Sequence, residues 1–380
     1  MTNKLSVYQH WDPLKVCIVG CSYPPEFYSW ITVPRVRTLF EKIAIETEED
    51  YQCIVNKLKE FDVEVMRPTV PEFDNIFING KYLPPPMTPR DHMIMIGETF
   101  YGGYRLPFSQ FYDSVKANSW PQCNTLEEFD SLPTWIQTEC TEVHNLKKLI
   151  NFYSSYDAIF NNIHRHGNTI KFEQNISHAP GAFITRVGKD LYFGTESYDA
   201  DQLLYQQQID KEFTQTRNHI VNTGGHSDGV FCPVCPGLVI SLKDVPTYAT
   251  TFPGWEVIYL PAQSWNAVRP FLDLKKKNGG KWWIPGFEQD QDVVDTVEQW
   301  LGHWTGYVEE TVFDVNMLII DPKNVMVFGY NKQVFDALDR YGITPHIVPF
   351  RHRYFWDGGI HCVTSDLHRE GTMQDYFPNR

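Results

Sequence analysis

The feature that most constrains the fold is a strand–helix–strand pattern that recurs along the chain. A short apolar run, VCIVG at 16–20, predicts a buried strand, and a second strand is predicted at 63–65. Between them, apolar residues recur at helical spacing over 51–61, and Thr47 and Asp50 are suited to capping the start of that helix. Alternation of strands and helices predicts an α/β fold.

Two further segments repeat this order. Near the end of the chain the sequence predicts two paired strands, a helix and a third strand, at 316–321, 324–329, 334–342 and 343–350. Earlier, FITRVGKDLYFG at 183–194 predicts a hairpin, which an amphipathic helix with Leu203, Leu204 and Ile209 follows. The copies share a pattern of elements and no obvious sequence identity.

Length and composition favour one large unit. No convincing linker divides the chain, so residues 1–380 are expected to form a single domain. Within it, scattered Pro, Trp, Asn and Asp weaken the periodicity at about 104–170, which predicts a loop-rich insertion. The 42% hydrophobic content provides a substantial core.

Charge and cysteine usage narrow the class of partner. The net charge of -14 argues against general affinity for nucleic acid or anionic membranes and favours a small molecule or a protein. The sequence has no recognisable leader and no apolar run of membrane-spanning length, so we expect a cytoplasmic protein. Its eight cysteines are dispersed, which is typical of reduced thiols.

Three polar clusters adjoin predicted strands: TPRDHM at 88–93, GGHSDG at 224–229 and DGGIHCVTSDLHREG at 357–371. In the third cluster, Gly358 and Gly359 allow a tight turn that presents Cys362, the candidate nucleophile. The alternative is that this cysteine is a buried structural residue, which is the usual role of a free thiol.

The other two clusters supply charged candidates. If the HSD stretch is extended, His226 and Asp228 face the same side and converge on one ligand. The alternative is a structural or surface pair. Asp91 is a candidate ligand for a cation such as a guanidinium, whereas an ion pair between Arg90 and Asp91 is the structural alternative.

A metal site is a competing interpretation. Cys232 and Cys235 form a CxxC pair near His226, which is half of a tetrahedral zinc site. No matching second pair is present, and the CxxC lies in an apolar strand-like run, which favours buried structural thiols. We therefore expect no metal at this pair of cysteines.

The clusters, taken in order, resemble a known family. HWDPLKVCIVG, TPRD, HSDGVFCPVCPGLVIS and GGIHCVTSDLHREGTMQDY resemble motifs of the amidinotransferase branch of the guanidino-group-modifying enzymes, in particular the glycine amidinotransferases. The resemblance runs through most of the chain. It implies the pentein fold, a five-bladed α/β propeller of repeated ββαβ units around a central site.

The resemblance also implies roles for individual residues. Cys362 matches the family's nucleophile, and His226 matches its general acid and base. Asp91 and Asp228 match the carboxylates that hold the guanidinium. Asn316, in VNMLIID, matches a family strand position and is expected, together with Arg90, on the substrate side of the site.

The implied reaction moves the amidino group of L-arginine to an amine such as glycine. It proceeds through a covalent amidino-Cys362 intermediate in a ping-pong cycle and needs no cofactor. Family members include homodimers, and we expect one here. The acceptor amine is not encoded in any motif, since variable loops select it.

The sequence departs from the family pattern at one position, and this departure leaves two alternative functions open. An acidic residue, in a segment like DAADF or EGGD, normally orients the catalytic histidine, and here the corresponding stretch is SHAPGAF at 177–183. His178 and Glu173 lie nearby but off the expected position. The alternatives are a guanidino-group hydrolase of the deiminase or dihydrolase type, and an inactive guanidine-binding homologue.

Overall fold

The computed structural model describes most of the chain. The described residues are 4–70, 72–73, 76–78, 80–102, 131–136, 154–171, 181–195, 201–242, 247–260, 284, 286–287, 289–301 and 314–380. Most of the predicted insertion at 104–170 lies outside them, as do His178 and Glu173. None of the helices in these ranges is long and apolar enough to cross a membrane.

Five three-stranded sheets form the described framework, and they share one pairing pattern. In each sheet a central strand pairs antiparallel with one neighbour and parallel with the other. Four sheets take consecutive strands: β5 (Met93–Ile96), β6 (Thr99–Gly102) and β7 (Thr169–Lys171); β8 (Ile184–Val187), β9 (Asp190–Thr195) and β10 (Arg217–Asn222); β11 (Phe231–Cys235), β12 (Leu238–Ser241) and β13 (Glu256–Tyr259); β14 (Leu318–Asp321), β15 (Asn324–Val327) and β16 (Thr344–Ile347).

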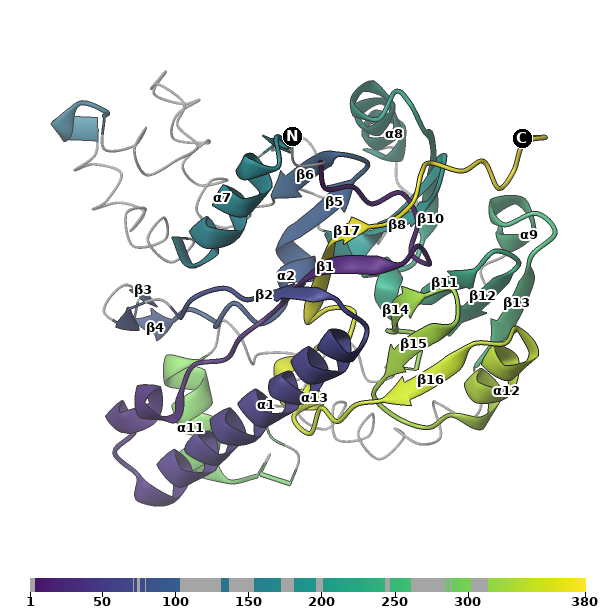
Figure 1. The fold of residues 1–380 in the computed structure, drawn as a ribbon. Coiled ribbons are helices and arrows are strands. Elements are labelled where there is room, and N and C mark those ends of the chain that lie inside the picture. The colour runs from purple at the N-terminus through teal and green to yellow at the C-terminus, as the bar shows by residue number, and fades with distance from the viewer. Residues whose placement is uncertain are drawn as a thin grey trace.

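The fifth sheet joins segments from the two halves of the chain. β17 (Thr364–Arg369) pairs antiparallel with β1 (Leu14–Val19), and β1 pairs parallel with β2 (Glu64–Met66) (Figure 1). A separate short hairpin consists of β3 (Phe77–Ile78) and β4 (Lys81–Tyr82). The predicted mixture of strands and helices is confirmed as an α/β fold.

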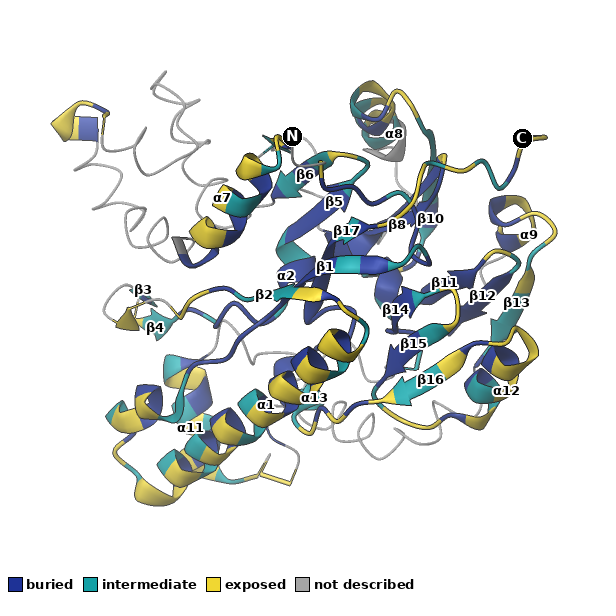
Figure 2. Cartoon of the chain, viewed as in Figure 1, coloured by how far each residue is buried: buried dark blue, intermediate teal, exposed yellow. Residues whose placement is uncertain are grey.

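Helices connect the strands and cover the sheets. They are α1 (Pro34–Glu60), α2 (Pro89–His92), α7 (Asp157–Arg165), α8 (Asp201–Glu212), α9 (Tyr248–Thr251), α11 (Gln291–Trp300), α12 (Lys332–Arg340) and α13 (Arg353–Trp356), with 3-10 turns η1 (Pro25–Trp30), η3 (Ser154–Tyr156), η5 (Gly181–Phe183) and η6 (Ser227–Gly229). The outward face of α1 is exposed, while most strand residues are buried (Figure 2). This is the apolar-in, polar-out arrangement of an amphipathic helix on a core.

The predicted start of the first helix is wrong. α1 begins at Pro34, so Thr47 and Asp50 lie inside the helix and do not cap it. Both side chains are buried and bind the segment before Cys362: Thr47 Oγ1 accepts from Trp356 Nε1 at 2.8 Å, and Asp50 Oδ2 accepts from the Arg351 backbone N–H at 2.6 Å. These polar residues therefore anchor a distant loop.

A buried ion cluster links several sheets. Asp366 on β17 accepts from Arg90 Nη2 at 2.8 Å, Arg186 Nη2 at 2.7 Å and Arg369 Nε at 2.6 Å. Burial opposes ionisation of Asp366, but the three guanidinium groups outweigh it and hold the pKa of the carboxyl well below its ordinary value. Arg186 and Arg369 also donate to the carbonyls of Met95 on β5 and Ile319 on β14.

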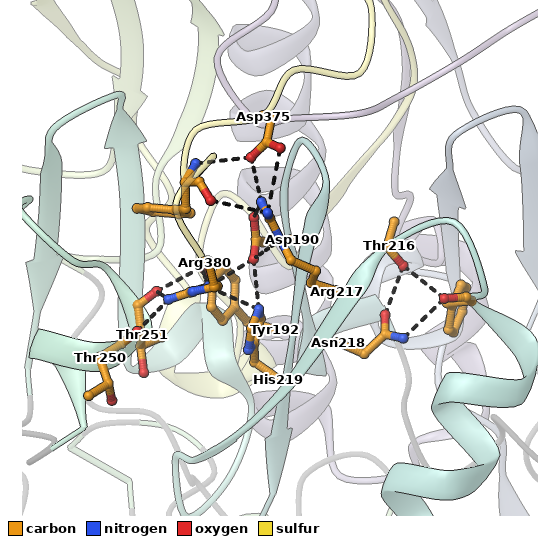
Figure 3. A network of polar contacts seen from close by, with 12 residues as sticks. Asp190, Tyr192, Thr216, Arg217, Asn218, His219, Thr250, Thr251, Asp375 and Arg380 are labelled. Carbon is orange, nitrogen blue, oxygen red and sulfur yellow. Dashed lines mark hydrogen bonds and ion pairs between the residues drawn. The ribbon is translucent and has the colours of Figure 1, made fainter.

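A second polar cluster fastens residues 375–380 to the sheet of β8, β9 and β10 (Figure 3). The buried Asp190 accepts from Arg217 Nη2 at 2.6 Å and from Arg380 Nη1 at 2.8 Å, and it contacts His219 Nε2 at 2.7 Å. Burial raises the pKa of Asp190, but the hydrogen bonds from these three groups outweigh it and lower the pKa overall.

Asp190→Asn is expected to lower the free energy of unfolding by about 1–3 kcal/mol, because hydrogen bonds to a buried carboxylate are lost. Because the pKa of Asp190 is lowered in the folded protein, the ionised carboxylate stabilises the fold at neutral pH. This stabilisation is lost as the pH falls through the lowered pKa. Urea unfolding of both proteins at neutral pH measures the difference. Equal free energies of unfolding would show that the Asp190 carboxylate makes no net contribution to stability.

Candidate active site

The loop that carries Cys362 lies between α13 and β17. The glycines were predicted to make its turn, but the residue with left-handed backbone is Asp357, at φ 49°. Gly359 serves a different purpose, since a Cβ there would fall 2.2 Å from Oδ1 of Asn316. Glycine at this position therefore permits the close approach of the Asn316 amide to the loop.

Cys362 is 2% exposed and lies among polar groups. Asn316 Nδ2 donates to Cys362 Sγ at 3.1 Å, and Asp228 Oδ2 lies 3.7 Å from the same sulfur. Three of the candidates, from three separate parts of the chain, are thus brought together. A cysteine with amide and carboxylate neighbours differs from the apolar setting that a structural thiol prefers.

Asp228 belongs to a buried pair with His361. His361 Nδ1 lies 2.8 Å from Asp228 Oδ2. Burial raises the pKa of Asp228, but the bond to His361 and the charges of His226 and Arg90 outweigh it and lower the pKa overall. Burial and the charge of Arg90 lower the pKa of His361, so a neutral imidazole donates its Nδ1–H to an ionised carboxylate.

His361 is a functional candidate that sequence reasoning missed. Its sequence signal was its place beside Cys362 in GGIHC. Only the fold reveals that its ring meets Asp228, a residue 133 positions earlier in the chain. Its ring also lies 5.6 Å, centre to centre, from the ring of the buried His10.

The HSD segment is not extended, so the condition under which His226 and Asp228 would face the same side is not met. Residues 227–229 form the 3-10 turn η6, and His226 precedes it. His226 Nδ1 lies 3.9 Å from Asp91 Oδ1, and its ring meets the ring of Phe183 edge-on at 4.7 Å. The turn thus directs His226 towards Asp91 while Asp228 meets Cys362.

Asp91 lies on the short helix α2, partly buried beside His226. Burial raises the pKa of Asp91, and the nearby Asp228 adds to that effect, although His226 and His92 oppose it. Oδ1 of Asp91 and Oδ1 of Asp228 are buried and have no hydrogen-bond partner among the described residues. Buried carboxylate oxygens of this kind are suited to N–H donors of a cationic ligand.

Arg90 is fully buried and points into the Asp366 cluster. Its Nε donates to the Thr364 carbonyl at 3.2 Å, and its backbone N–H donates to the Cys362 carbonyl at 3.3 Å. Arg90 therefore makes its ion pair with Asp366 and holds the backbone of the loop that carries Cys362.

The segment that lacks the expected acid is described from Gly181 onward. Gly181 packs against the carbonyls of Arg90 and Met93, where a Cβ would fall 2.6 Å and 2.5 Å from the two oxygens. The Ala182 carbonyl accepts from Ser227 Oγ at 2.9 Å. This turn supports the HSD segment through packing and a backbone contact.

The zinc hypothesis finds no support in the described residues. Cys232 and Cys235 are buried on β11, and burial raises their pKa values to about 12 and about 11. Within the described ranges, no group of three or more His, Cys, Asp or Glu side chains is placed to hold a metal ion. Both thiols therefore behave as neutral core residues.

Comparison with known proteins complements this geometry. No family model matches the chain. It is 28% identical over 152 residues to mitochondrial glycine amidinotransferase from Xenopus tropicalis, a match that covers 40% of this chain and 28% of that protein. L-arginine:L-lysine amidinotransferase from Pseudomonas savastanoi pv. phaseolicola is 22% identical over 153 residues, which cover 40% of this chain and 33% of that protein. The matched part thus spans no more than a third of either relative.

Solved structures extend the likeness to nearly the whole chain. SxtG, an amidinotransferase of saxitoxin biosynthesis from Microseira wollei, superposes with a TM-score of 0.58 over 98% of this chain and 99% of its own, at 16% identity. Inosamine-phosphate amidinotransferase StrB1 from Streptomyces griseus gives 0.59 over the same shares, at 17% identity. The chain thus resembles amidinotransferases in fold over nearly its whole length and in sequence over the matched 40%. The resemblance expected from the motifs is thereby confirmed.

Proposed function

We propose that this chain is an amidinotransferase that takes the amidino group from L-arginine through Cys362. The observation that carries the proposal is a pair of aspartates that each keep one buried oxygen without a hydrogen bond, Asp228 beside Cys362 and Asp91 beside His226. A planar guanidinium presents N–H donors in the geometry that two carboxylates accept. The likeness to amidinotransferases supports the same assignment.

In the proposed first half-reaction, the carboxylates hold the guanidinium plane against Cys362. The thiolate attacks the guanidinium carbon and forms a C–S bond, and the resulting tetrahedral adduct then breaks its C–N bond to the departing amine. His226 gives that amine a proton. Ornithine leaves, and the amidino group stays on the sulfur.

In the second half-reaction an acceptor amine takes the place of ornithine. His226 removes a proton from it, the amine attacks the amidino carbon, and the C–S bond breaks to regenerate the thiolate. Water in place of the amine would give hydrolysis with the same residues. In this scheme Arg90 supports the nucleophile loop and has no contact with the substrate.

We also propose that the five sheets surround this site as the blades of one pentein-type domain. Their common strand pairing supports this arrangement. So does the Asp366 cluster, whose contacts reach α2, β5, β8, β14 and β17.

The proposed function is tested by incubating the purified protein with L-arginine, alone and with a panel of amines that includes glycine. Ornithine that forms only with an acceptor, together with a guanidino product, is the expected result. Citrulline or urea formed without an acceptor would instead identify a hydrolase. Arginine binding without turnover across the panel would indicate an inactive homologue.

The raised pKa of Asp91 predicts that arginine affinity depends on pH. In a Cys362→Ala background, arginine affinity is expected to fall with decreasing pH as Asp91 gains a proton, because the neutral acid no longer balances the guanidinium. Since the pKa is raised, the loss begins above the ordinary aspartate value of about 3.9. Calorimetry from about pH 4 to pH 8 checks this. Asp91→Asn should bind weakly throughout, and a flat wild-type profile would contradict the assignment.

A further inference from the structure

The side chain of Asn316 makes four contacts around the nucleophile. Asn316 precedes β14 and is 1% exposed. Its Oδ1 accepts from the backbone N–H of His361 at 2.8 Å and from that of Cys362 at 3.3 Å. Its Nδ2 donates to Cys362 Sγ at 3.1 Å and to the Asp228 carbonyl at 3.3 Å.

These contacts use the whole hydrogen-bonding capacity of the amide. A carboxamide has two donor hydrogens and an oxygen that accepts two bonds. The two backbone N–H groups require the oxygen on their side, so the NH₂ group must face the sulfur. No donor or acceptor of Asn316 remains for a ligand, which argues against the substrate contact expected from the sequence.

We propose that Asn316 is a catalytic residue that stabilises the Cys362 thiolate by donating a hydrogen bond to Sγ. An N–H donor favours an anionic acceptor over a neutral one. The carboxylate of Asp228, 3.7 Å from the sulfur, acts in the opposite direction, because a second negative charge disfavours the thiolate. Asn316 offsets that repulsion while the two carboxylates remain charged for the substrate.

The bond acts at both ends of the proposed cycle, and this consequence rests on the proposed function. It favours the thiolate before attack on the guanidinium carbon. It is weaker when the sulfur carries the amidino group, since that sulfur is neutral. It strengthens again as the C–S bond breaks, so it also assists departure of the thiolate in the second half-reaction.

Asn316→Asp is the matched variant. Aspartate keeps an oxygen for the backbone N–H groups of His361 and Cys362. It replaces the NH₂ group, which donates to Cys362 Sγ and to the Asp228 carbonyl, by a negatively charged oxygen. The measurement is the rate of Cys362 alkylation by iodoacetamide as a function of pH, followed by peptide mass spectrometry, with no substrate present. Because arginine turnover is not involved, the result is independent of whether the proposed function is right.

The alkylation rate of Asn316→Asp at pH 7 is expected to fall by about tenfold or more, and its pH midpoint should rise by about one unit or more. Asn316→Ala, which adds no charge, should move the midpoint in the same direction by less, and it serves if the aspartate variant does not fold. Unchanged midpoints in both variants would overturn the proposal. A loss of arginine affinity in Asn316→Ala with an unchanged midpoint would instead make Asn316 a substrate ligand.

Discussion

Cys362→Ala is expected to abolish amidino transfer, with a loss of at least about 10⁴-fold in kcat. The sulfur is the only atom in the proposed cycle that bonds to the amidino carbon on the enzyme. Neither carboxylate can replace it, because both are required to hold the cationic substrate. Ornithine release from L-arginine in the presence of an active acceptor is the measurement.

A matched control is Cys235→Ala, which removes another buried thiol. Burial raises the pKa of Cys235 to about 11, so this group is neutral at working pH and has no part in the proposed chemistry. It should retain transfer activity. The Cys362 variant should also still bind arginine, since Asp91 and Asp228 are intact. Transfer that persists in Cys362→Ala would rule out the mechanism.

Asp366→Asn is expected to lower the free energy of unfolding by about 3–5 kcal/mol. The carboxylate is fully buried and neutralises part of the charge of Arg90, Arg186 and Arg369. Asparagine leaves three buried guanidinium groups without an anion among them. Because the pKa of Asp366 is far below its ordinary value, the loss applies throughout the neutral range. Urea unfolding measures it.

The control for this prediction is Asp336→Asn on α12. Asp336 pairs with Lys332 one helical turn away, and both side chains are more than half exposed. Exposed pairs of this kind contribute little, so the control should unfold at the parent's urea concentration. If Asp366→Asn does the same, the buried cluster does not hold the sheets together.

Local patterns predicted several elements correctly. The hairpin of β8 and β9, the hairpin of β14 and β15 and the helix α12 all follow from apolar periodicity and turn residues near in sequence. The start of α1 was missed because Thr47 and Asp50 resemble capping residues. Their real partners, Trp356 and Arg351, lie about 300 residues away, and no local signal could reveal them.

The sequence motifs identify most residues of the candidate site, but they do not predict which of these residues contact one another. The motifs singled out Cys362 and Asp228, which the fold brings together. The pairing of Asp228 with His361 and the four hydrogen bonds of Asn316 depend on contacts between loops and turns that are far apart in the sequence. No periodic pattern in the sequence marks such contacts, because each residue resembles an ordinary polar residue at a strand end.

A covalent intermediate on Cys362 is tested by mass spectrometry of the protein after incubation with L-arginine and no acceptor amine, quenched rapidly in acid. We expect a species heavier by one amidino group, with the added mass on the peptide that contains Cys362. Addition of an active acceptor should remove that mass. A modified peptide without Cys362, or ornithine formed with no modified protein at any time, would contradict a covalent intermediate on this cysteine.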